Sequence, residues 1–308
     1  MAKESPVLVL GEALVDVVHQ AGTVAEHVGG SPANVAFGLG RLGHDVTLAA
    51  WIGRDDRGGR IVAACEAAGV ALAEGSDGAE RTSIADATVD EAGRATYVFD
   101  LDWRLPALSG LAEARHVHTG SIAATLEPGG SQVLAAVRRA RAHATVSYDP
   151  NARPTLMGGP DEARPRIEDL IGLSDLVKAS DEDIEWLYPG QAVADVVRTW
   201  LGLGAAAIVV TRGPEGAYYA VGSGEVIAEA APMAVAVVDT VGAGDSFMSG
   251  LVSGLLDAGL LGGPQERARL AEAGVDELRP AVERAIRTSA VTVSKAGAYG
   301  PTRGELDF

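Results

Sequence analysis

The chain has 308 residues, which allows a large buried core, and its 25 Lys and Arg against 42 Asp and Glu give a formal net charge of −17. A surface this acidic disfavours DNA, RNA or an anionic membrane as a partner, and it would repel ATP at long range. One cysteine excludes an internal disulfide, and the sequence shows neither a secretory leader nor an apolar run of membrane-spanning length, so we expect a soluble cytoplasmic protein.

The first part of the chain predicts two strands, each followed by a helix. Val7–Leu10 is a short apolar strand, and a glycine pair precedes a helix that Ser31 would cap, with Pro32 at its first position. Two glycines are more than capping needs, although they suit the close approach of a ligand. The other elements expected here are a strand at Val46–Ile52 and a helix at Asp55–Ala68, ended by Gly69.

Residues 82–103 show a different pattern. Polar and apolar side chains alternate on both sides of Glu91-Ala92-Gly93, which is typical of a hairpin with one face in water. Together with segment 13–28, this hairpin predicts a small sheet that stands apart from the main core. Because it is interleaved with the main fold and too small to be stable alone, we interpret it as a lid on one domain that spans residues 1–308.

From Ala114 onward, strands and helices alternate along the chain. Such alternation predicts a mostly parallel sheet with helices on both faces, so we expect an α/β protein with a three-layer α/β/α sandwich. Ligands of such sheets gather at the carboxyl ends of the strands. Six polar residues fall at or just past expected strand ends and would meet on one rim: Asp16, Ser121, Asp149, Ser180, Thr211 and Asp239.

The rest of the chain is organised around residues 238–247. The apolar run Ala234–Val238 predicts a buried strand, and apolar residues spaced by four from Phe247 onward predict an amphipathic helix. Between them, Gly242, Ala243 and Gly244 let the backbone turn tightly and leave its N–H groups uncovered. Such a turn into a helix makes an anion site, because the first helical amides lack partners and the helix dipole favours negative charge.

Asp245 lies in the first turn of that helix. A carboxylate beside an anion site repels the anion, unless it takes a proton from the group that attacks the anion. Amides for a phosphoryl group and a base for the nucleophile are what phosphoryl transfer to a hydroxyl requires. The alternative is an aspartate that only complements the helix dipole. We favour the base, because Asp239 and Asp245 bracket the same short turn.

One glycine pattern is misleading. Residues 38–43 match the G-x-G-x-x-G spacing of dinucleotide-binding proteins, but that motif works only directly after a strand, whereas this one ends a helix. Close helix packing and a glycine at the helix end explain it better, which argues against a dehydrogenase. No P-loop pattern occurs in the sequence, so Walker-type ATP chemistry is also excluded.

Further polar residues each allow a functional and a structural interpretation. The amide of Asn34 would face the hydroxyls of a ligand, and Asp16 would accept two hydroxyl hydrogen bonds or be an ordinary loop aspartate. Arg153 would neutralise phosphate oxygens or pair with Asp161 and Glu162 on the surface. The segment 180–183 caps a helix through Ser180, and its acidic residues would help to hold Mg²⁺ through water. The segment 211–216 is a turn with two glycines.

The sequence resembles a known family at this point. Residues 29–34 and 239–245 are similar to the two signatures of the ribokinase-like (PfkB) carbohydrate kinases, and the resemblance runs from Gly11 to about Pro301. Within that family the segments 118–122, 149–153 and 178–180 are most similar to those of fructokinases.

The resemblance implies roles for individual residues. Asp245 would deprotonate the sugar hydroxyl, and Gly242, Ala243 and Gly244 would form the anion hole. The sugar would contact Asp16, Gly30, Asn34 and Phe99, while Arg153 would reach the sugar or the transferring phosphoryl group. The nucleotide would contact Lys178, Ser180, Thr211, Gly213 and Gly216, together with Gly242 and Gly244. Asp239 would face a monovalent cation such as K⁺.

Two departures from the family pattern concern the metal and the substrate. The N-x-x-E pattern, which handles Mg²⁺ and phosphate, ends here in the shorter Asp183. Many fructokinases carry Phe-Tyr-Arg on the lid strand, where this chain has Phe99-Asp100-Leu101, although Arg104 lies close by.

We therefore expect an ATP- and Mg²⁺-dependent sugar kinase that acts on fructose. Another ketose, ribose or a nucleoside is the alternative, and 2-keto-3-deoxygluconate is disfavoured because Asp100 replaces an arginine that would suit a carboxylate. A non-catalytic sugar or nucleotide sensor on the same fold is the rival from another class, although a sensor has no use for the base. We also expect a homodimer in which two lids clasp each other, because water must be kept from the phosphoryl group and the apolar lid face must be covered.

Overall fold

The computed structural model describes residues 6–20, 22–89 and 95–306, so the expected turn Glu91-Ala92-Gly93 lies outside the described residues. Its main element is a nine-stranded sheet with the order β13-β12-β11-β10-β9-β8-β1-β4-β5. The seven parallel strands are β1 (Val7–Leu10), β4 (Val46–Ala49), β5 (Val70–Leu72), β8 (His116–Gly120), β9 (Thr145–Asp149), β10 (Leu176–Ser180) and β11 (Ala207–Thr211). The antiparallel strands β12 (Ala217–Val221) and β13 (Ile227–Ala230) complete one edge.

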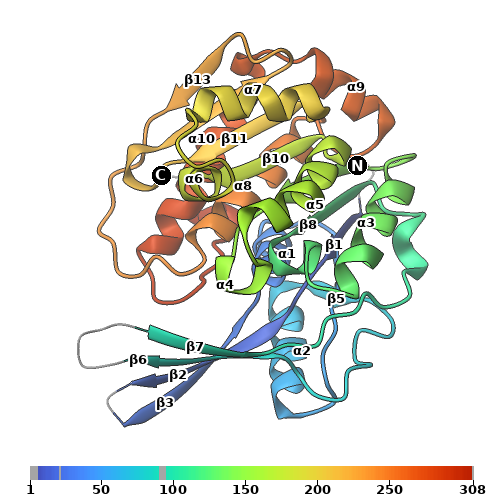
Figure 1. Ribbon diagram of the computed structural model, residues 1–308, viewed down its shortest axis with the longest axis vertical. Coiled ribbons are helices and arrows are strands. Elements are labelled where there is room, and N and C mark those ends of the chain that lie inside the picture. The colour runs from blue at the N-terminus through green and yellow to red at the C-terminus, as the bar shows by residue number, and fades with distance from the viewer. Residues whose placement is uncertain (1–5, 21, 90–94, 307–308) are drawn as a thin grey trace.

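Helices cover both faces of this sheet (Figure 1). One face packs against α1 (Ser31–Arg41), α2 (Asp56–Ala68), α8 (Ala243–Asp257), α9 (Pro264–Glu272) and α10 (Val275–Val293). The opposite face packs against α3 (Gly129–Ala140), α5 (Pro160–Leu173), α6 (Asp181–Leu187) and α7 (Val193–Leu203), and the short α4 (Pro154–Met157) precedes α5. The predicted three-layer α/β/α sandwich is confirmed.

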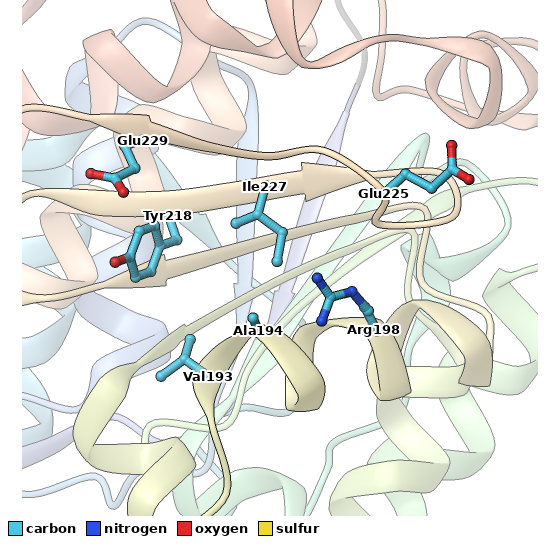
Figure 2. Close-up of a pocket in the computed structure, with 7 residues that line it drawn as sticks. All are labelled: Val193, Ala194, Arg198, Tyr218, Glu225, Ile227 and Glu229. Carbon is cyan, nitrogen blue, oxygen red and sulfur yellow. The ribbon is translucent and has the colours of Figure 1, made fainter.

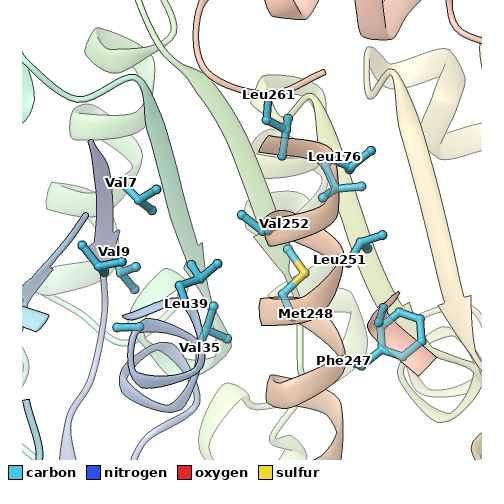
Figure 3. Close-up of a cluster of buried hydrophobic side chains, with 14 of the residues drawn as sticks. Val7, Val9, Val35, Leu39, Leu176, Phe247, Met248, Leu251, Val252 and Leu261 are labelled. Atoms are coloured by element: carbon cyan, nitrogen blue, oxygen red, sulfur yellow. The ribbon is translucent and has the colours of Figure 1, made fainter. Parts of the chain in front are cut away.

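Side chains of β1 show why both faces must be covered. Val7 and Val9 join the hydrophobic cluster of one face, while Leu8 and Leu10 join that of the other, because successive side chains of a strand point to opposite sides. Figure 3 shows Val7 and Val9 on the same side of the sheet as the packed side chains of α1 and α8. The apolar residues predicted for α8 are all buried there: Phe247, Leu251 and Leu255.

A second, four-stranded sheet has the order β3-β2-β6-β7 and extends away from the main body (Figure 1). Strands β2 (Leu14–Gln20) and β3 (Thr23–Gly29) pair antiparallel, β2 and β6 (Ile84–Val89) pair parallel, and β6 and β7 (Ala95–Asp100) pair antiparallel. The small sheet built from segments 13–28 and 82–103 is therefore confirmed, although it contains one parallel pair.

The misleading glycine pattern lies inside α1, as expected. A Cβ atom on Gly38 would sit 2.4 Å from Ser249 Oγ on α8, and one on Gly40 would sit 2.3 Å from the carbonyl oxygen of Ala68. These glycines let α1 pack closely on its neighbours. None of the helices in the described ranges has the length and hydropathy needed to cross a bilayer.

One predicted element is wrong. The run Ala234–Val238 forms no strand, and Val237 and Val238 are 63% and 65% exposed. The edge of the sheet is already occupied by β13, and the amides of Val238 and Asp239 instead bond to the carbonyl oxygen of Val293 at the end of α10. The chain thus enters the turn before α8 from an exposed loop.

Candidate active site

The anion-hole turn requires glycine at Gly242 and is closely packed at Gly244. Gly242 is the residue before the first turn of α8 and has a φ of 74°, and no side chain caps this helix. A Cβ atom on Gly242 would sit 2.6 Å from that of Ala298, and one on Gly244 would sit 3.1 Å from Nζ of Lys178. The turn is therefore packed from two sides, while the amides of the first helical turn have no side-chain partner and suit an anion.

Asp245 is buried at the start of α8, and two side chains of α1 hold its carboxylate. Ser31 Oγ donates to Oδ1 at 2.7 Å, and Asn34 Nδ2 donates to Oδ2 at 2.8 Å. Asn151 Nδ2 donates to Ser31 Oγ at 2.7 Å and approaches Asp245 Oδ1 at 3.4 Å. These donors fix the orientation of the carboxylate that the sequence singles out as a base.

Ser31 does not have the predicted capping role. The residue before α1 is Gly30, no side chain caps the helix, and the Ser31 hydroxyl bonds to Asp245, 214 residues away in the sequence. Asn151, with a φ of 37°, completes the same network from the loop after β9. Nothing in the local sequence reveals either role, because each depends on the packing of separate elements.

Residues predicted to bind the sugar lie where β2 and α1 meet. Gly30 has a φ of 103°, and a Cβ atom there would sit 2.5 Å from the carbonyl oxygen of Glu12. Asp16 pairs across the small sheet with His27, a residue that sequence reasoning missed. Burial raises the pKa of the Asp16 carboxyl, and the charges of His27 and Arg153 oppose this shift.

Phe99 belongs to the same cross-strand row as Asp16, because Asp16 pairs with Ala85 and Ala85 pairs with Phe99. The neighbouring Asp100 instead accepts a hydrogen bond from Arg81 at 2.7 Å. Arg104 lies 3.6 Å from Asp102 and is more than half exposed. The lid strand thus presents Phe99 on the face of Asp16, and both nearby arginines pair with acidic residues.

Arg153 folds back on its own loop. Its Nη1 atom donates to Asn151 Oδ1 at 2.7 Å and to the carbonyl oxygen of Ala152 at 3.0 Å. Asp161, the alternative partner suggested by the sequence, pairs with Arg164 at 3.0 Å. Arg153 is exposed next to a residue that contacts Asp245, so an incoming ligand can reach it without breaking an ion pair.

The side of the rim assigned to the nucleotide is formed by the ends of β10 and β11. Ser180 caps α6, as expected, by accepting a hydrogen bond from the amide of Asp183. The Asp183 carboxylate accepts from the amides of Ala152 and Ser180, at 2.7 and 2.8 Å. It therefore ties the loop after β9 to the start of α6, and a contact with Mg²⁺ through water stays a prediction.

The turn after β11 brings Thr211 and two glycines to the same edge. Gly213 has a φ of 49° and Gly216 a φ of 88°. A Cβ atom on Gly216 would sit 2.1 Å from the carbonyl oxygen of Ala230, so only glycine fits beside β13. The Thr211 hydroxyl donates to the carbonyl oxygen of Ala179, which fixes it at the end of β10.

Asp239 joins two loops. Its carboxylate accepts hydrogen bonds from the amides of Val241 and Gly297, at 3.0 and 2.8 Å. These backbone bonds lower the pKa of the carboxyl group, so Asp239 is ionised at neutral pH. It is thus a fixed negative charge next to the anion-hole turn, which suits a cation ligand.

Glu12 carries a buried carboxyl group, and its backbone lies next to Gly30, one of the residues predicted to bind the sugar. Burial raises its pKa to about 7, although a hydrogen bond from the amide of Ala123 opposes this shift. The folded state therefore binds more protons than the unfolded state between about pH 4.5 and 7, and stability falls as pH rises through that window.

Replacing Glu12 with Gln should remove this loss. Between pH 5 and pH 8 we expect the stability of Glu12→Gln relative to wild type to rise by roughly 2.5 kcal/mol, since each pKa unit corresponds to about 1.4 kcal/mol. Urea unfolding at both values measures the difference, with the exposed Glu74→Gln as control. A stability difference between Glu12→Gln and wild type that does not change with pH would show that folding does not raise the pKa of Glu12.

A groove of about 560 Å³ lies between α7 and the strands β12 and β13 (Figure 2). It contains none of the residues discussed above as a sugar, anion or base site. Its lining is formed by Val193, Ala194, Arg198, Tyr218, Glu225, Ile227 and Glu229.

Comparison with known proteins agrees with this geometry. The sequence model of the pfkB family carbohydrate kinases matches residues 7–303. A fructokinase of Klebsiella pneumoniae is 34% identical over 275 residues, which span 85% of this chain and 87% of that protein.

Solved structures agree as well. A double mutant of the fructokinase of Vibrio cholerae O395, with fructose, ADP and a potassium ion bound, matches with a TM-score of 0.79 at 25% identity, over 98% of this chain and 97% of its own. The ATP-bound fructokinase of Xylella fastidiosa has the same fold, with a TM-score of 0.85 at 24% identity over 99% of this chain and 97% of its own. The chain therefore belongs to the pfkB family of carbohydrate kinases.

Proposed function

We propose that this ATP-dependent sugar kinase transfers the γ-phosphoryl group of ATP to a hydroxyl group of fructose. The observation that supports this proposal best is the position of Asp245: one carboxylate, oriented by Ser31 and Asn34, next to an uncapped helix N-terminus. Fructose is favoured over other sugars because the Klebsiella pneumoniae relative and the Vibrio cholerae structure are both fructokinases.

Each of the site residues has its own proposed role in the reaction. Asp245 takes the proton from the sugar hydroxyl as its oxygen forms a bond to the γ-phosphorus atom, and the bond to the bridging oxygen of ADP breaks. The amides of Gly242, Ala243 and Gly244 stabilise the negative charge on the transferring group. Asp16, Gly30 and Asn34 hold the sugar so that one hydroxyl faces Asp245. Arg153 would swing toward the phosphoryl oxygens.

The nucleotide would lie along the ends of β10 and β11, against Ser180, Thr211 and the turn at Gly213 and Gly216. The exposed Val237, Val238 and Val241 would give the adenine ring of ATP an apolar surface beside the anion-hole turn. This role would explain why an apolar segment predicted to be a buried strand lies in solvent.

Metal ions would act with the nucleotide. Within the described part of the chain, no three His, Cys, Asp or Glu side chains are grouped to hold a metal, so Mg²⁺ would be bound mainly by the phosphates of ATP, with Asp183 contributing through water. Mg²⁺ would neutralise phosphate charge. Asp239 would be the acidic ligand of K⁺, next to the anion-hole turn.

A sugar panel tests the substrate. We expect kcat/KM from ADP release to be at least tenfold higher for fructose than for ribose, other ketoses, nucleosides or 2-keto-3-deoxygluconate, because the relatives above are fructokinases. Asp100 stands where an arginine would suit a sugar acid, and its ion pair with Arg81 leaves no positive charge there for the carboxylate of such a substrate. A higher kcat/KM for any other member of the panel would reassign the substrate, while sugar-independent ADP release would favour a protein that only binds its ligands.

The small sheet would act as a lid and as a dimer interface. Its face with Asp16 also carries the apolar side chains of Val18, Ala25 and Phe99, which are partly or fully exposed. A second copy of this chain would cover that surface, and lid closure would exclude water from the phosphoryl group.

Two variants that introduce a charge test the proposed dimer contact between two lids, called the clasp below. Val18→Lys on the apolar face should convert a dimer into a monomer, whereas Val24→Lys on the opposite face should leave the dimer intact. Light scattering after size-exclusion chromatography gives the mass. A wild-type monomer would contradict the clasp alone. Lid closure should increase the protection of the amides of Tyr97 to Leu101 against hydrogen exchange when fructose binds, and unchanged protection at saturation would contradict the lid.

A further inference from the structure

A buried ion pair lies directly behind the anion-hole turn. Lys178 Nζ donates to Asp149 Oδ2 at 2.9 Å, and the two side chains are 4% and 0% exposed. Val177 pairs with Tyr148 in the parallel register of β9 and β10. Lys178 and Asp149 are the next residues of the two strands, so they lie side by side. Asp149 is the last residue of β9, at the edge of the sheet that carries the active site, and Lys178 lies two residues before the end of β10.

This pair is costly for a purely structural element. Burying two charges loses their hydration, and the attraction between them commonly does no more than offset that loss. Leu176, two residues before Lys178 and on the same face of β10, is a buried apolar residue, which shows what packing alone favours on this face. The second oxygen of Asp149, Oδ1, is buried without a hydrogen-bond partner, so the pair is not optimised for stability.

The position of the ammonium group links the pair to the reaction. A Cβ atom on Gly244 would sit 3.1 Å from Nζ, so Lys178 packs against the backbone of the turn itself. The charged or titratable groups that face it are Asp149 on β9, Asp183 on α6, Asp245 on α8 and His118 on β8. Lys178 is thus a cation among three carboxylates, behind amides that suit an anion.

We propose that Lys178 is a positioning residue for phosphoryl transfer: held by Asp149, it supports the anion hole from behind with a fixed positive charge. Protein covers its ammonium group, so it acts through the Gly244 backbone rather than as a surface contact to ATP. The charge would offset the repulsion between the Asp245 carboxylate and the phosphoryl group, which is present until Asp245 takes the proton of the hydroxyl, and it would stabilise the negative charge of the transferring group. This inference rests on the proposed function.

A double variant separates this role from a structural one. Lys178→Met alone should reduce kcat about 100-fold, as expected for the loss of a charge at an oxyanion site, and should also lower the melting temperature because Asp149 is left unpaired. In Asp149→Leu/Lys178→Met, both charges are gone. The melting temperature should return to within a few degrees of wild type, while kcat should stay at least about 30-fold low and ATP affinity should change little.

A matched control removes an ion pair at the other end of the sheet. Arg267 donates to Asp175 at 2.7 Å, far from the anion-hole turn in the fold, because Asp175 precedes β10. Arg267→Met should lower the melting temperature without lowering kcat. Recovery of kcat to more than a tenth of wild type in the folded Asp149→Leu/Lys178→Met variant would overturn the proposal.

Asp149→Asn gives an independent test if the double variant does not fold. Without its carboxylate partner, buried Lys178 loses its proton more easily, so kcat of this variant should fall between pH 7 and 9.5 while that of wild type stays level. Parallel profiles would overturn the inference. No sugar-dependent ADP release by wild type would instead overturn the proposed function and the inference with it, whereas wild-type turnover with an active double variant would overturn the inference alone.

Discussion

Replacing Asp245 with Asn is expected to abolish turnover while leaving the affinities for ATP and fructose within roughly tenfold of wild type. The amide has the shape of the carboxylate and still accepts a hydrogen bond from Ser31, but it cannot take the proton of the sugar hydroxyl. Steady-state kinetics with fructose give kcat, and calorimetric titration of the variant with each substrate gives the affinities.

A control on the same helix distinguishes chemistry from folding. Asp257 ends α8 in ion pairs with Arg284 and Arg303, so Asp257→Asn should reduce stability and leave kcat nearly unchanged. An Asp245→Asn variant that keeps more than a tenth of wild-type kcat would remove Asp245 from the role of base.

Substitutions of the residues proposed to bind the sugar should separate effects on substrate binding from effects on the chemical step. Asp16→Ala is expected to raise the KM for fructose at least tenfold and that for ATP little, because a carboxylate that accepts sugar hydroxyls is lost. Asn34→Ala should raise the fructose KM as well. It should also lower kcat, since Asn34 donates to Asp245 at 2.8 Å and the variant loses that orientation.

The comparison of these two variants is informative in itself. Equal increases in the KM values of both substrates would place Asp16 and Asn34 outside the sugar site. A kcat for Asn34→Ala equal to that of Asp16→Ala would indicate that the bond from Asn34 does not orient the base. Ser31→Ala provides a third point, because it should affect kcat more than the fructose KM.

Hydrophobic patterning predicted most of the architecture. The alternation of apolar strands and amphipathic helices after Ala114 indicated the parallel sheet, and the glycine after Ala68 ends α2 in the left-handed conformation that this position favours. The pattern failed at Ala234–Val238, because a run of apolar β-branched residues is typical of a buried strand, whereas the edge of this sheet is already occupied by β13.

The site was predictable only in part. The glycines and Asp245 lie within four residues of one another, so local sequence indicates an anion site with a base. The partners of the base are distant: Asn151 approaches Asp245 across 94 residues of sequence, and Lys178 meets Asp149 through the register of two strands. Such contacts follow from packing, and the sequence alone does not reveal them.

The central claim is that this chain transfers a phosphoryl group from ATP to fructose. Its most direct test is the stoichiometry of the wild-type reaction: ADP and fructose phosphate measured in the same samples, by coupled assay and by phosphorus NMR, with and without fructose. We predict one fructose phosphate for each ADP and little ADP without the sugar. ADP that forms at the same rate without fructose, or without phosphorylated sugar, would contradict the account.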